Sequence, residues 1–543
     1  MEGMLVCPGN YAPLTPISFL EQAAIVHGDK TSIIYGATRF SWRQTYDRCL
    51  KLASALVNLK ISPGDIVAAL APNIPALYEL HFGVPMAGAV LSALNVRLDA
   101  AMLASKLQEL EAKIIFADHL FVELAQRALD TLSYKNLNLP LLVLIPECPS
   151  LDELHKPNDG TLEYDGVLEM GRVDDFEIVR PGNECDPVSV NFTSGSTGVP
   201  KGVIYSHRAA YLNSLAQISR FDMGESPVFL WAVDMFRCNG WCFPWTMAAL
   251  GGTNICLNNV SGKSIFNALA IHRVTHICGA PSILIKIADF AQEVSHPSRP
   301  LPWKVHVIVA GALPTTQVLM KVEKMGFYLS HGYGMTEALG PVIVRPLKTS
   351  SQHEKIRPQD PINNHLLVDV KDPETTKSVP QDGKTIGEVM FKGNLLMSGY
   401  FKNPKATHEA FRGGWYHTGD LAVRQPNGHI QMKDRAKDMI NFGGEPISTL
   451  EIEAVLNMNP KVLESAVVGK RLENDHLKET PCAFVQLKEG FNASAEEIVE
   501  FCRDHLPNFM VPYTVIFGEL PVNSTGKVQK FVLKKAANVI HSC

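Results

Sequence analysis

The chain has 543 residues, of which 46% are hydrophobic and 19% are charged, with 39 glycines and 35 prolines scattered along it. This globular composition excludes a single small module, a disordered protein, a collagen and a coiled coil, and the length predicts more than one folded unit. The formal net charge is −5 and no window holds five or six like charges in a row, which argues against non-specific nucleic-acid binding.

The N-terminus and the most apolar stretch predict neither export nor a transmembrane segment. Glu2 stands where a signal peptide carries positive charge, and Pro8 and Gly9 interrupt any apolar segment. The most apolar stretch, 82–96, contains Pro85 and is shorter than the roughly 20 residues that span a bilayer, so it predicts a buried helix. The 11 cysteines lack paired or zinc-type spacing, which indicates reduced, mostly buried thiols in the cytosol or an organelle matrix.

Short β-branched runs alternate with amphipathic segments up to residue 329, which is typical of an α/β fold with mainly parallel sheets. After the strand predicted at 113–117, helical spacing follows over 119–129. The other strands predicted in this part of the chain are 65–70, 141–145, 188–192, 305–309 and 327–329.

The character of the sequence changes twice after this region. A polar stretch rich in Pro, Asp and Asn, 349–384, predicts irregular or antiparallel structure. After Asp434 the pattern predicts a smaller unit, which gives an N-terminal domain of residues 1–434 and a C-terminal domain of residues 435–543.

Within the smaller unit, Ser448-Thr-Leu-Glu451 has the spacing of a capping box that opens a helix. A second helix is predicted at 494–506, and strands are predicted at 465–468, 482–487 and 513–517. This mixture predicts a small α+β domain.

Ten residues directly after the strand at 188–192 read Thr193-Ser-Gly-Ser-Thr-Gly-Val-Pro-Lys-Gly202. Small residues let backbone N–H groups approach a polyphosphate, hydroxyls add donors, and Lys201 supplies a positive charge. A Walker A loop is excluded, because two residues separate Gly198 from Lys201. The segment predicts a phosphate-binding loop, with a flexible surface loop as the alternative.

Four later stretches carry chemistry of the same kind. Tyr333-Gly-Met-Thr-Glu337 follows a strand and combines a flat ring for a purine, a hydroxyl for a phosphate and a carboxylate for Mg²⁺. Tyr416-His-Thr-Gly-Asp420 ends in a carboxylate that can accept both hydroxyls of a ribose, with an Asp-stabilised turn as the alternative. Asp434–Glu445 carries charges and a Gly-Gly pair, and Asn523–Lys530 places Lys527 after a turn of small residues. Each of these two segments alone would be read as solvated surface.

Together and in this order, the five stretches resemble the AMP-forming adenylating enzymes, which include acyl-CoA synthetases, 4-coumarate:CoA ligases, luciferases and the adenylation domains of peptide synthetases. The resemblance covers nearly the whole chain. Segments 10–20 and 238–245 are in addition similar to plant acyl-activating enzymes, which use short-chain, branched and benzoic or cinnamic acids. The resemblance implies a carboxylic acid:CoA ligase that forms an acyl-AMP and uses ATP, Mg²⁺ and coenzyme A.

The implied fold has a large α/β N-terminal domain, with mainly parallel sheets flanked by helices plus a β-subdomain, and a small mobile α+β C-terminal domain. Lys527 is the implied lysine of the adenylating step, Thr336 contacts the α-phosphate and Glu337 binds Mg²⁺. The other implied nucleotide-binding residues are Thr193, Ser194, Gly195, Ser196, Thr197, Gly198 and Lys201 for phosphate, Gly311, Ala312, Leu313, His331, Gly332 and Tyr333 for adenine, and Asp420 and Arg435 for ribose. The remaining implied residues are Lys437 at the hinge, Gly443 and Gly444 along the path of coenzyme A, and Arg237, Ala310 and Gly332 at the acyl pocket.

The chain departs from this family at the acyl pocket. Related ligases carry Leu-Pro-Met-Phe-His where this chain reads Val233-Asp-Met-Phe-Arg237, so a gating histidine is replaced. We expect Asp234 and Arg237 to form an ion pair at the pocket rim, because buried charges are usually paired. The alternative is that either charge contacts a polar substrate, such as a hydroxylated or amino-bearing acid.

The ending His541-Ser-Cys543 departs from the Ser-Lys-Leu signal of many plant relatives, since it lacks the central basic residue and the terminal leucine. We therefore expect a cytosolic enzyme, with a peroxisomal one as the alternative. A different acceptor for the acyl group, and a nucleotide-binding relative without catalysis, stay open as other functions. The sequence carries no clear mark of the acid used or of the oligomeric state.

Overall fold

The computed structural model describes residues 5, 7, 9–147, 162–193, 200–257, 259–293, 301–311, 316–347, 366–443, 445–472, 475–522 and 527–539. Residue contacts divide the chain into two compact units. The first comprises residues 1–193, 201–352 and 394–404, and the second comprises residues 194–200, 353–393 and 405–543. The domain boundary predicted after Asp434 falls inside the second unit and stays a prediction.

One sheet of the first unit has the strand order β17–β8–β7–β4–β3–β5–β6, in which the five strands from β7 to β6 are parallel and β8 is antiparallel to both of its neighbours, β7 and β17. Its strands are β3 (Ile66–Leu70), β4 (Val90–Ala93), β5 (Ile114–Asp118), β6 (Leu141–Ile145), β7 (Pro187–Phe192), β8 (Gly202–Ser206) and β17 (Gly399–Tyr400). The strands β3, β4 and β5 are buried along their whole length and are mostly apolar, as expected for a parallel sheet covered on both faces.

The second sheet of this unit has the order β14–β13–β12–β11–β9–β10–β1–β2, with antiparallel strands only at its two edges. Its strands are β1 (Thr31–Tyr35), β2 (Thr38–Ser41), β9 (Val228–Leu230), β10 (Thr253–Cys256), β11 (His276–Gly279), β12 (Val305–Ala310), β13 (Phe327–Met335) and β14 (Gly340–Pro346). The alternation of strands and helices confirms the predicted α/β class.

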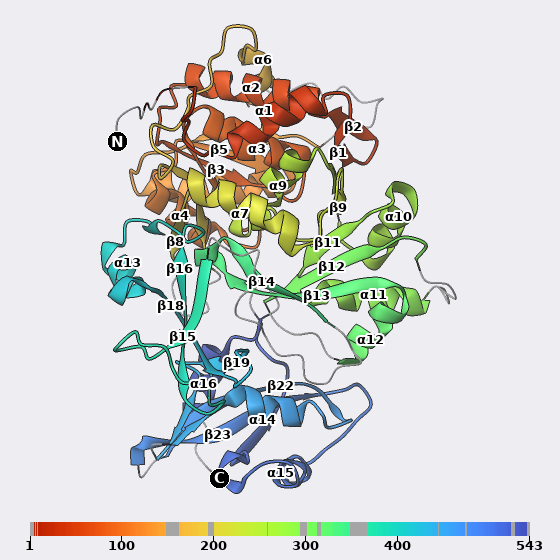
Figure 1. Cartoon of the computed structure of the whole chain (residues 1–543), viewed down its shortest axis with the longest axis vertical. Coiled ribbons are helices and arrows are strands. Elements are labelled where there is room, and N and C mark those ends of the chain that lie inside the picture. The colour runs from red at the N-terminus through yellow and green to blue at the C-terminus, as the bar shows by residue number, and fades with distance from the viewer. Residues whose placement is uncertain are drawn as a thin grey trace. The chain divides into compact units, whose positions relative to one another are not determined.

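Helices pack against both sheets of the first unit. Figure 1 shows α10, α11 and α12 beside β11, β12 and β13, and their apolar side chains form one buried core with Val305, Val307 and Val309. The α-helices are α1 (Ile17–Val26), α2 (Trp42–Asn58), α3 (Pro75–Met86), α4 (Ala100–Leu110), α5 (Val122–Tyr134), α6 (Tyr164–Met170), α7 (His207–Arg220), α8 (Cys238–Trp241), α9 (Phe243–Leu250), α10 (Gly262–His272), α11 (Ser282–Glu293) and α12 (Thr316–Lys324). Two 3₁₀ turns, η1 (His119–Phe121) and η2 (Thr336–Ala338), complete this list.

The single buried helix predicted over 82–96 is wrong. Helix α3 ends at Met86, Gly88 has a φ of +75°, and strand β4 begins at Val90. An apolar run is compatible with either a buried helix or a buried strand, so hydrophobicity did not reveal the break that the left-handed glycine makes.

The second unit begins with an antiparallel sheet of β15 (Leu366–Lys371), β16 (Ile386–Gly393), β18 (Tyr416–Arg424) and β19 (Ile430–Arg435). The further strands are β20 (Ile440–Phe442), β21 (Glu445–Ile447), β22 (Val462–Leu472), β23 (Asp475–Leu487) and β24 (Thr514–Phe517). The helices are α13 (Pro404–Ala410), η3 (Arg412–Gly414), α14 (Thr449–Leu456), α15 (Ala495–Arg503), η4 (Asn508–Met510) and α16 (Lys530–Val539).

Local signals placed several of these elements correctly. The Ser448 hydroxyl accepts the backbone N–H of Glu451 at 3.3 Å and caps α14, as predicted. Ser494 caps α15 in the same way, and the three strands predicted in this region correspond to β22, β23 and β24. Antiparallel structure within the polar stretch is confirmed by β15, which pairs with β16.

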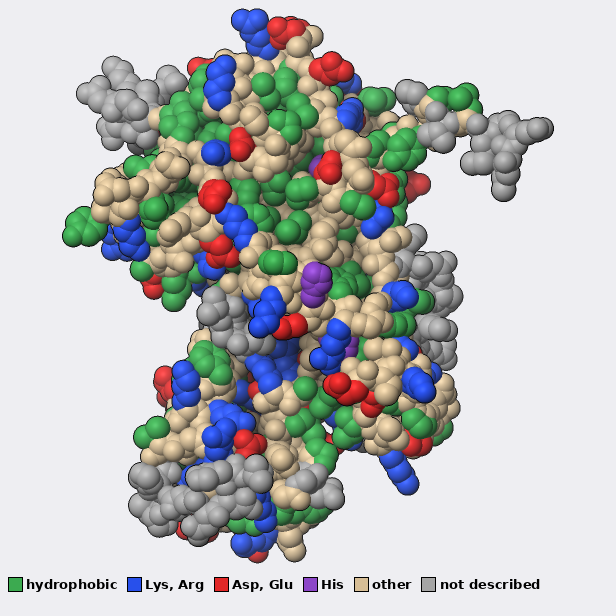
Figure 2. All heavy atoms as spheres, turned by 90° about the vertical axis from the view of Figure 1, so that its left-hand side faces the viewer, with side chains coloured by type: hydrophobic (Ala, Val, Ile, Leu, Met, Phe, Trp, Pro, Cys, Tyr) green, Lys and Arg blue, Asp and Glu red, His purple; other side chains and the backbone are tan. Residues whose placement is uncertain are grey.

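The mixed charge on the surface and the free, mostly buried cysteines agree with the predictions made from the composition. On the face shown in Figure 2, acidic and basic side chains are interspersed with hydrophobic and neutral ones. The nine cysteines among the described residues are free thiols, and six of them are buried. None of the described helices combines the length and the apolar character needed to cross a membrane.

Candidate active site

The base of the predicted phosphate loop is closed by two hydrogen bonds between the ends of β7 and β8. The Thr193 N–H donates to the Lys201 carbonyl at 2.9 Å, and the Lys201 N–H donates to Thr193 Oγ1 at 3.0 Å. The ammonium of Lys201 lies 4.7 Å from the centroid of the Tyr400 ring, within the range of a cation–π contact. The predicted loop residues Ser194, Gly195, Ser196, Thr197 and Gly198 lie outside the described residues.

The Thr336-Glu337 pair sits on η2, directly after β13. The Tyr400 hydroxyl donates to Glu337 Oε1 at 2.8 Å, and the Tyr205 hydroxyl donates to the Thr336 carbonyl at 2.6 Å. Tyr400 therefore contacts both Lys201 and Glu337, so the fold brings the phosphate-loop lysine and the predicted Mg²⁺ ligand to one tyrosine.

A left-handed turn of the chain contacts both β7 and the Thr336-Glu337 pair. All five residues from Cys238 to Cys242 have φ between 42° and 67°, a conformation that L-residues seldom adopt in succession. The buried side-chain oxygen Oδ1 of Asn239 accepts from the Ser189 hydroxyl at 2.6 Å and from the Asn191 side-chain amide, both on β7. At the first residue of the turn, the Cys238 thiol donates to Thr336 Oγ1 at 3.6 Å. Backbone strain of this kind persists only where surrounding contacts hold it.

Four of the predicted adenine and acyl-pocket residues lie on neighbouring strands. Gly332 on β13 is in register with Ala310 on β12, and His331 and Tyr333 flank it. A Cβ atom at Gly332 would lie 2.9 Å from the Cβ of Pro341, so glycine permits this close approach of strands. Of the predicted segment after β12, Gly311 is described, whereas Ala312 and Leu313 lie outside the described residues.

The predicted ion pair between Asp234 and Arg237 is confirmed, whereas its place at the rim of an acyl pocket stays a prediction. Arg237 Nε lies 2.8 Å from Asp234 Oδ2, and Arg97 Nη1 lies 3.2 Å from the same oxygen. Arg97 has no distinctive sequence context, so the second cation at this carboxylate was missed. Two guanidinium groups share one carboxylate at this position.

In the second unit, strand pairing brings the predicted ribose ligands together. Asp420 on β18 and Arg435 on β19 are directly opposite each other, and Arg435 Nε lies 3.0 Å from Asp420 Oδ1. Asp420 is buried. The short hairpin between the two strands fixes this register, which the sequence spacing alone did not reveal.

Lys527 lies among the same charges. Burial, together with the positive field of Arg435, lowers the pKa of the Lys527 ammonium to about 8, although Asp420 and Asp438 oppose the shift. Burial also lowers the pKa of the nearby Lys437, the predicted hinge residue. The structure thus brings Asp420, Arg435, Lys437 and Lys527 together within one unit.

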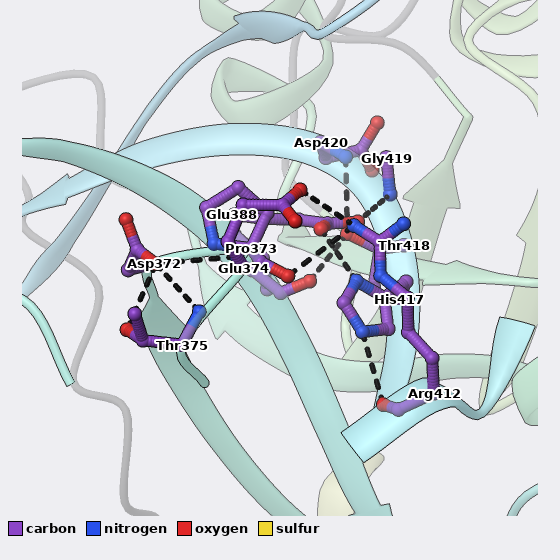
Figure 3. A network of polar contacts seen from close by, with 11 residues as sticks. Asp372, Pro373, Glu374, Thr375, Glu388, Arg412, His417, Thr418, Gly419 and Asp420 are labelled. Atoms are coloured by element: carbon purple, nitrogen blue, oxygen red, sulfur yellow. Dashed lines mark hydrogen bonds and ion pairs between the residues drawn. The ribbon is translucent and has the colours of Figure 1, made fainter. Parts of the chain in front are cut away.

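The second unit also contains the predicted Gly443-Gly444 segment and one functional residue that the sequence did not reveal. Gly443 has a φ of +65° in the turn between β20 and β21, whereas Gly444 lies outside the described residues. Glu388 on β16 contacts the segment that leads into Asp420 (Figure 3), and no local motif marked it as important. In the first unit, Tyr205 and Tyr400 were missed because their partners lie far away in the chain.

The donor set suits a phosphate-bound Mg²⁺ better than an all-protein metal site. Within the described ranges, no group of three or more His, Cys, Asp or Glu side chains is arranged to hold a metal ion. Mg²⁺ in proteins is commonly bound by one or two carboxylates together with substrate phosphates and water. Glu337, held by Tyr400, fits the single-carboxylate arrangement.

Comparisons with known proteins cover both units. Residues 20–401 match the model of the AMP-binding enzyme family, and residues 451–527 match the model of the AMP-binding enzyme C-terminal domain. A peroxisomal butyrate–CoA ligase from Arabidopsis thaliana is 44% identical over 99% of this chain and 96% of the relative. A peroxisomal benzoate–CoA ligase from the same plant is 43% identical over 99% of this chain and 95% of the relative.

Solved structures share the fold at lower identity. An anthranilate CoA ligase in complex with anthranoyl-AMP superposes with a TM-score of 0.82 at 21% identity, covering 98% of this chain and 99% of that chain. An o-succinylbenzoate coenzyme A synthetase from Bacillus subtilis, in complex with ATP and magnesium ion, has a TM-score of 0.79 at 21% identity, covering 95% and 99%. The chain therefore has the adenylating-enzyme fold that the sequence predicted.

Proposed function

This chain belongs to the AMP-binding enzyme family, and from this premise we propose that it is an ATP-dependent carboxylic acid:CoA ligase working through an acyl-AMP intermediate. The names of its relatives, butyrate–CoA ligase and benzoate–CoA ligase, support both the acid substrate and the thiol acceptor. The observation that carries most weight is the position of Lys527 beside Asp420 and Arg435. This arrangement puts a partly buried ammonium next to the side chains proposed to bind the ribose.

In the first half-reaction, a carboxylate oxygen of the acid attacks the α-phosphorus of ATP, the bond to the β-phosphate oxygen breaks, and pyrophosphate leaves. We propose that Lys527 and Thr336 stabilise the charge that develops on the α-phosphoryl oxygens. Bound at Glu337, Mg²⁺ would offset phosphate charge as a Lewis acid. Asp420 and Arg435 hold the ribose, and the loop from Thr193 to Lys201 holds the phosphates.

In the second half-reaction, the thiol sulfur of coenzyme A attacks the carbonyl carbon of the acyl-AMP, the thiol proton is lost, and AMP leaves. The family resemblance suggests that the C-terminal domain rotates about Lys437 between the two steps, so that the Gly443-Gly444 segment replaces Lys527 at the acyl group. A hinge motion lets one site serve two geometries that exclude each other.

A two-stage assay tests this function. The first stage measures acid-dependent pyrophosphate release with ATP and Mg²⁺, and the second detects the acyl-CoA by mass after coenzyme A is added. We expect both products. The absence of pyrophosphate would indicate a nucleotide-binding protein without catalysis, and pyrophosphate without a thioester would indicate another acceptor.

For the acid itself, we propose a small or medium monocarboxylic acid, either aromatic or short and branched. We predict that Arg237→His leaves the ranking of acids unchanged, because the Arg237 guanidinium is already engaged with the Asp234 carboxylate at 2.8 Å rather than with the substrate. The measurement is turnover of cinnamate, benzoate, short branched acids and aromatic amino acids by both proteins. A reordered ranking would show that Arg237 contacts the acyl group.

We further predict that the adenylation half-reaction loses rate as the pH rises through about 8, because the pKa of the Lys527 ammonium lies there. The group is protonated and active below this pH and loses its charge above it. Lys527→Arg keeps the charge, since guanidinium does not deprotonate in this range, and therefore moves the falling limb to higher pH. The measurement is kcat/KM for ATP against pH in both proteins; an identical falling limb would assign the titration to another group.

For its location, we keep the cytosol as the prediction. The peroxisome is the alternative, because both named plant relatives are peroxisomal. Imaging of a fluorescent fusion with a free C-terminus separates them, because peroxisomal import gives puncta and a cytosolic protein gives a diffuse signal.

A further inference from the structure

The segment that presents Asp420 is anchored to β16 through a buried carboxylate. Glu388 is 6% exposed, and its Oε1 accepts the backbone N–H of Gly419 at 2.7 Å. Its Oε2 lies 2.7 Å from Nδ1 of His417 (Figure 3). A single side chain therefore contacts the residue directly before Asp420 and the residue three positions before it.

The His417 ring is held between two oxygen atoms. Its Nδ1 faces the Glu388 carboxylate, and its Nε2 faces the backbone carbonyl of Arg412 at 3.2 Å. The ring therefore links the buried Glu388 carboxylate to the backbone of η3. The guanidinium of Arg412, whose backbone carbonyl faces His417, lies 3.7 Å from a carboxylate oxygen of Glu374.

Further hydrogen bonds complete the anchoring. The Thr418 hydroxyl donates to the Val389 carbonyl at 2.6 Å and accepts the backbone N–H of Asp420 at 3.0 Å. The Gly419 carbonyl accepts the backbone N–H of Ala436 at 2.9 Å, directly after Arg435. Gly419 has a φ of +73°, so the chain turns sharply just before Asp420. Each of the three residues before Asp420 is thus tied to β16 or to the Arg435 segment.

From this geometry we infer that Glu388 and His417 are positioning residues that orient Asp420 toward the ribose hydroxyls of ATP. The inference rests on the proposed function, in which Asp420 accepts those hydroxyls. Glu388→Gln leaves one acceptor oxygen where the carboxylate has two, so the side chain cannot contact both the Gly419 N–H and the His417 ring through an acceptor oxygen, and the loss of charge weakens the hydrogen bond that remains. An Asp420 carboxylate displaced by a fraction of an ångström then makes poorer hydrogen bonds. The loss then falls on ribose recognition rather than on the chemistry at the α-phosphate.

The test compares kcat/KM for ATP with kcat/KM for 2′-deoxyATP and 3′-deoxyATP, which isolates the ribose contacts. We expect Glu388→Gln to reduce the preference for ATP about tenfold, mainly through a higher KM, and His417→Gln to reduce it by a smaller factor. Glu374→Gln is the matched control, because it removes an exposed carboxylate that contacts Arg412 and should leave the preference within about twofold. Thermal unfolding of each variant reports its folding, and His417→Gln decides the question if Glu388→Gln does not fold.

Asp420→Ala separates the two levels of the argument. If Asp420→Ala keeps the wild-type preference, the ribose role of Asp420 in the proposed function is wrong. If Asp420→Ala loses the preference while folded Glu388→Gln and His417→Gln retain it, the positioning role is overturned and the proposed function stands. We expect the double variant Glu388→Gln/Asp420→Ala to lose no more preference than Asp420→Ala, since both changes act on one contact.

Discussion

Lys527→Ala should lower the rate of acid-dependent pyrophosphate release about a thousandfold and leave thioester formation from supplied acyl-AMP within a few-fold of wild type. The physical reason is that Lys527 is a partly buried cation beside Asp420 and Arg435, where water screens its field less than on the open surface. The charge it stabilises develops only during attack on the α-phosphorus. The measurements are single-turnover rates of the two half-reactions, started with acid and ATP or with acyl-AMP and coenzyme A.

The matched control is Lys535→Ala, which removes an exposed lysine from α16 and is expected to leave both half-reactions unchanged. Unchanged thermal unfolding of Lys527→Ala would confirm that the loss is chemical. Equal loss of both half-reactions in Lys527→Ala would contradict the division of labour between the two steps.

Glu337→Gln should lower adenylation about a hundredfold and move the Mg²⁺ dependence to higher concentrations. The amide keeps the shape of the side chain and can still accept the Tyr400 hydroxyl, now 2.8 Å from Glu337 Oε1, so the change is confined to charge. Mg²⁺ prefers a carboxylate oxygen to a neutral amide. The measurement is the pyrophosphate release rate as a function of Mg²⁺ concentration at saturating ATP.

Tyr400→Phe provides the control, because it keeps the carboxylate and removes only the hydroxyl that orients it. We expect a loss below tenfold with the Mg²⁺ midpoint close to that of wild type. A Glu337→Gln variant with the wild-type Mg²⁺ midpoint would remove Glu337 from the metal site.

Local sequence signals were sufficient for most secondary structure and for the family. Ser448 and Ser494 marked the starts of α14 and α15 because a capping hydroxyl acts within three residues of itself. Each of the five stretches that carry the family resemblance is a continuous segment of sequence, so the stretches and their order along the chain could be read directly. The Asp234–Arg237 pair was predicted because buried charges are usually paired and these two opposite charges are close in the sequence.

Contacts between distant segments were decided by the tertiary structure alone. Tyr400 reaches Lys201 and Glu337 because β17 pairs with β8, and Glu388 reaches Gly419 because β16 pairs with β18. Neither Tyr400 nor Glu388 has neighbours in the sequence that signal its role. The break between α3 and β4 was missed for a related reason, since an apolar run satisfies burial in either conformation and Gly88 interrupts it only through its left-handed φ. The sequence by itself thus determined the residue types and their order, whereas strand register determined which of them meet, because backbone hydrogen bonds align residues that lie far apart in the chain.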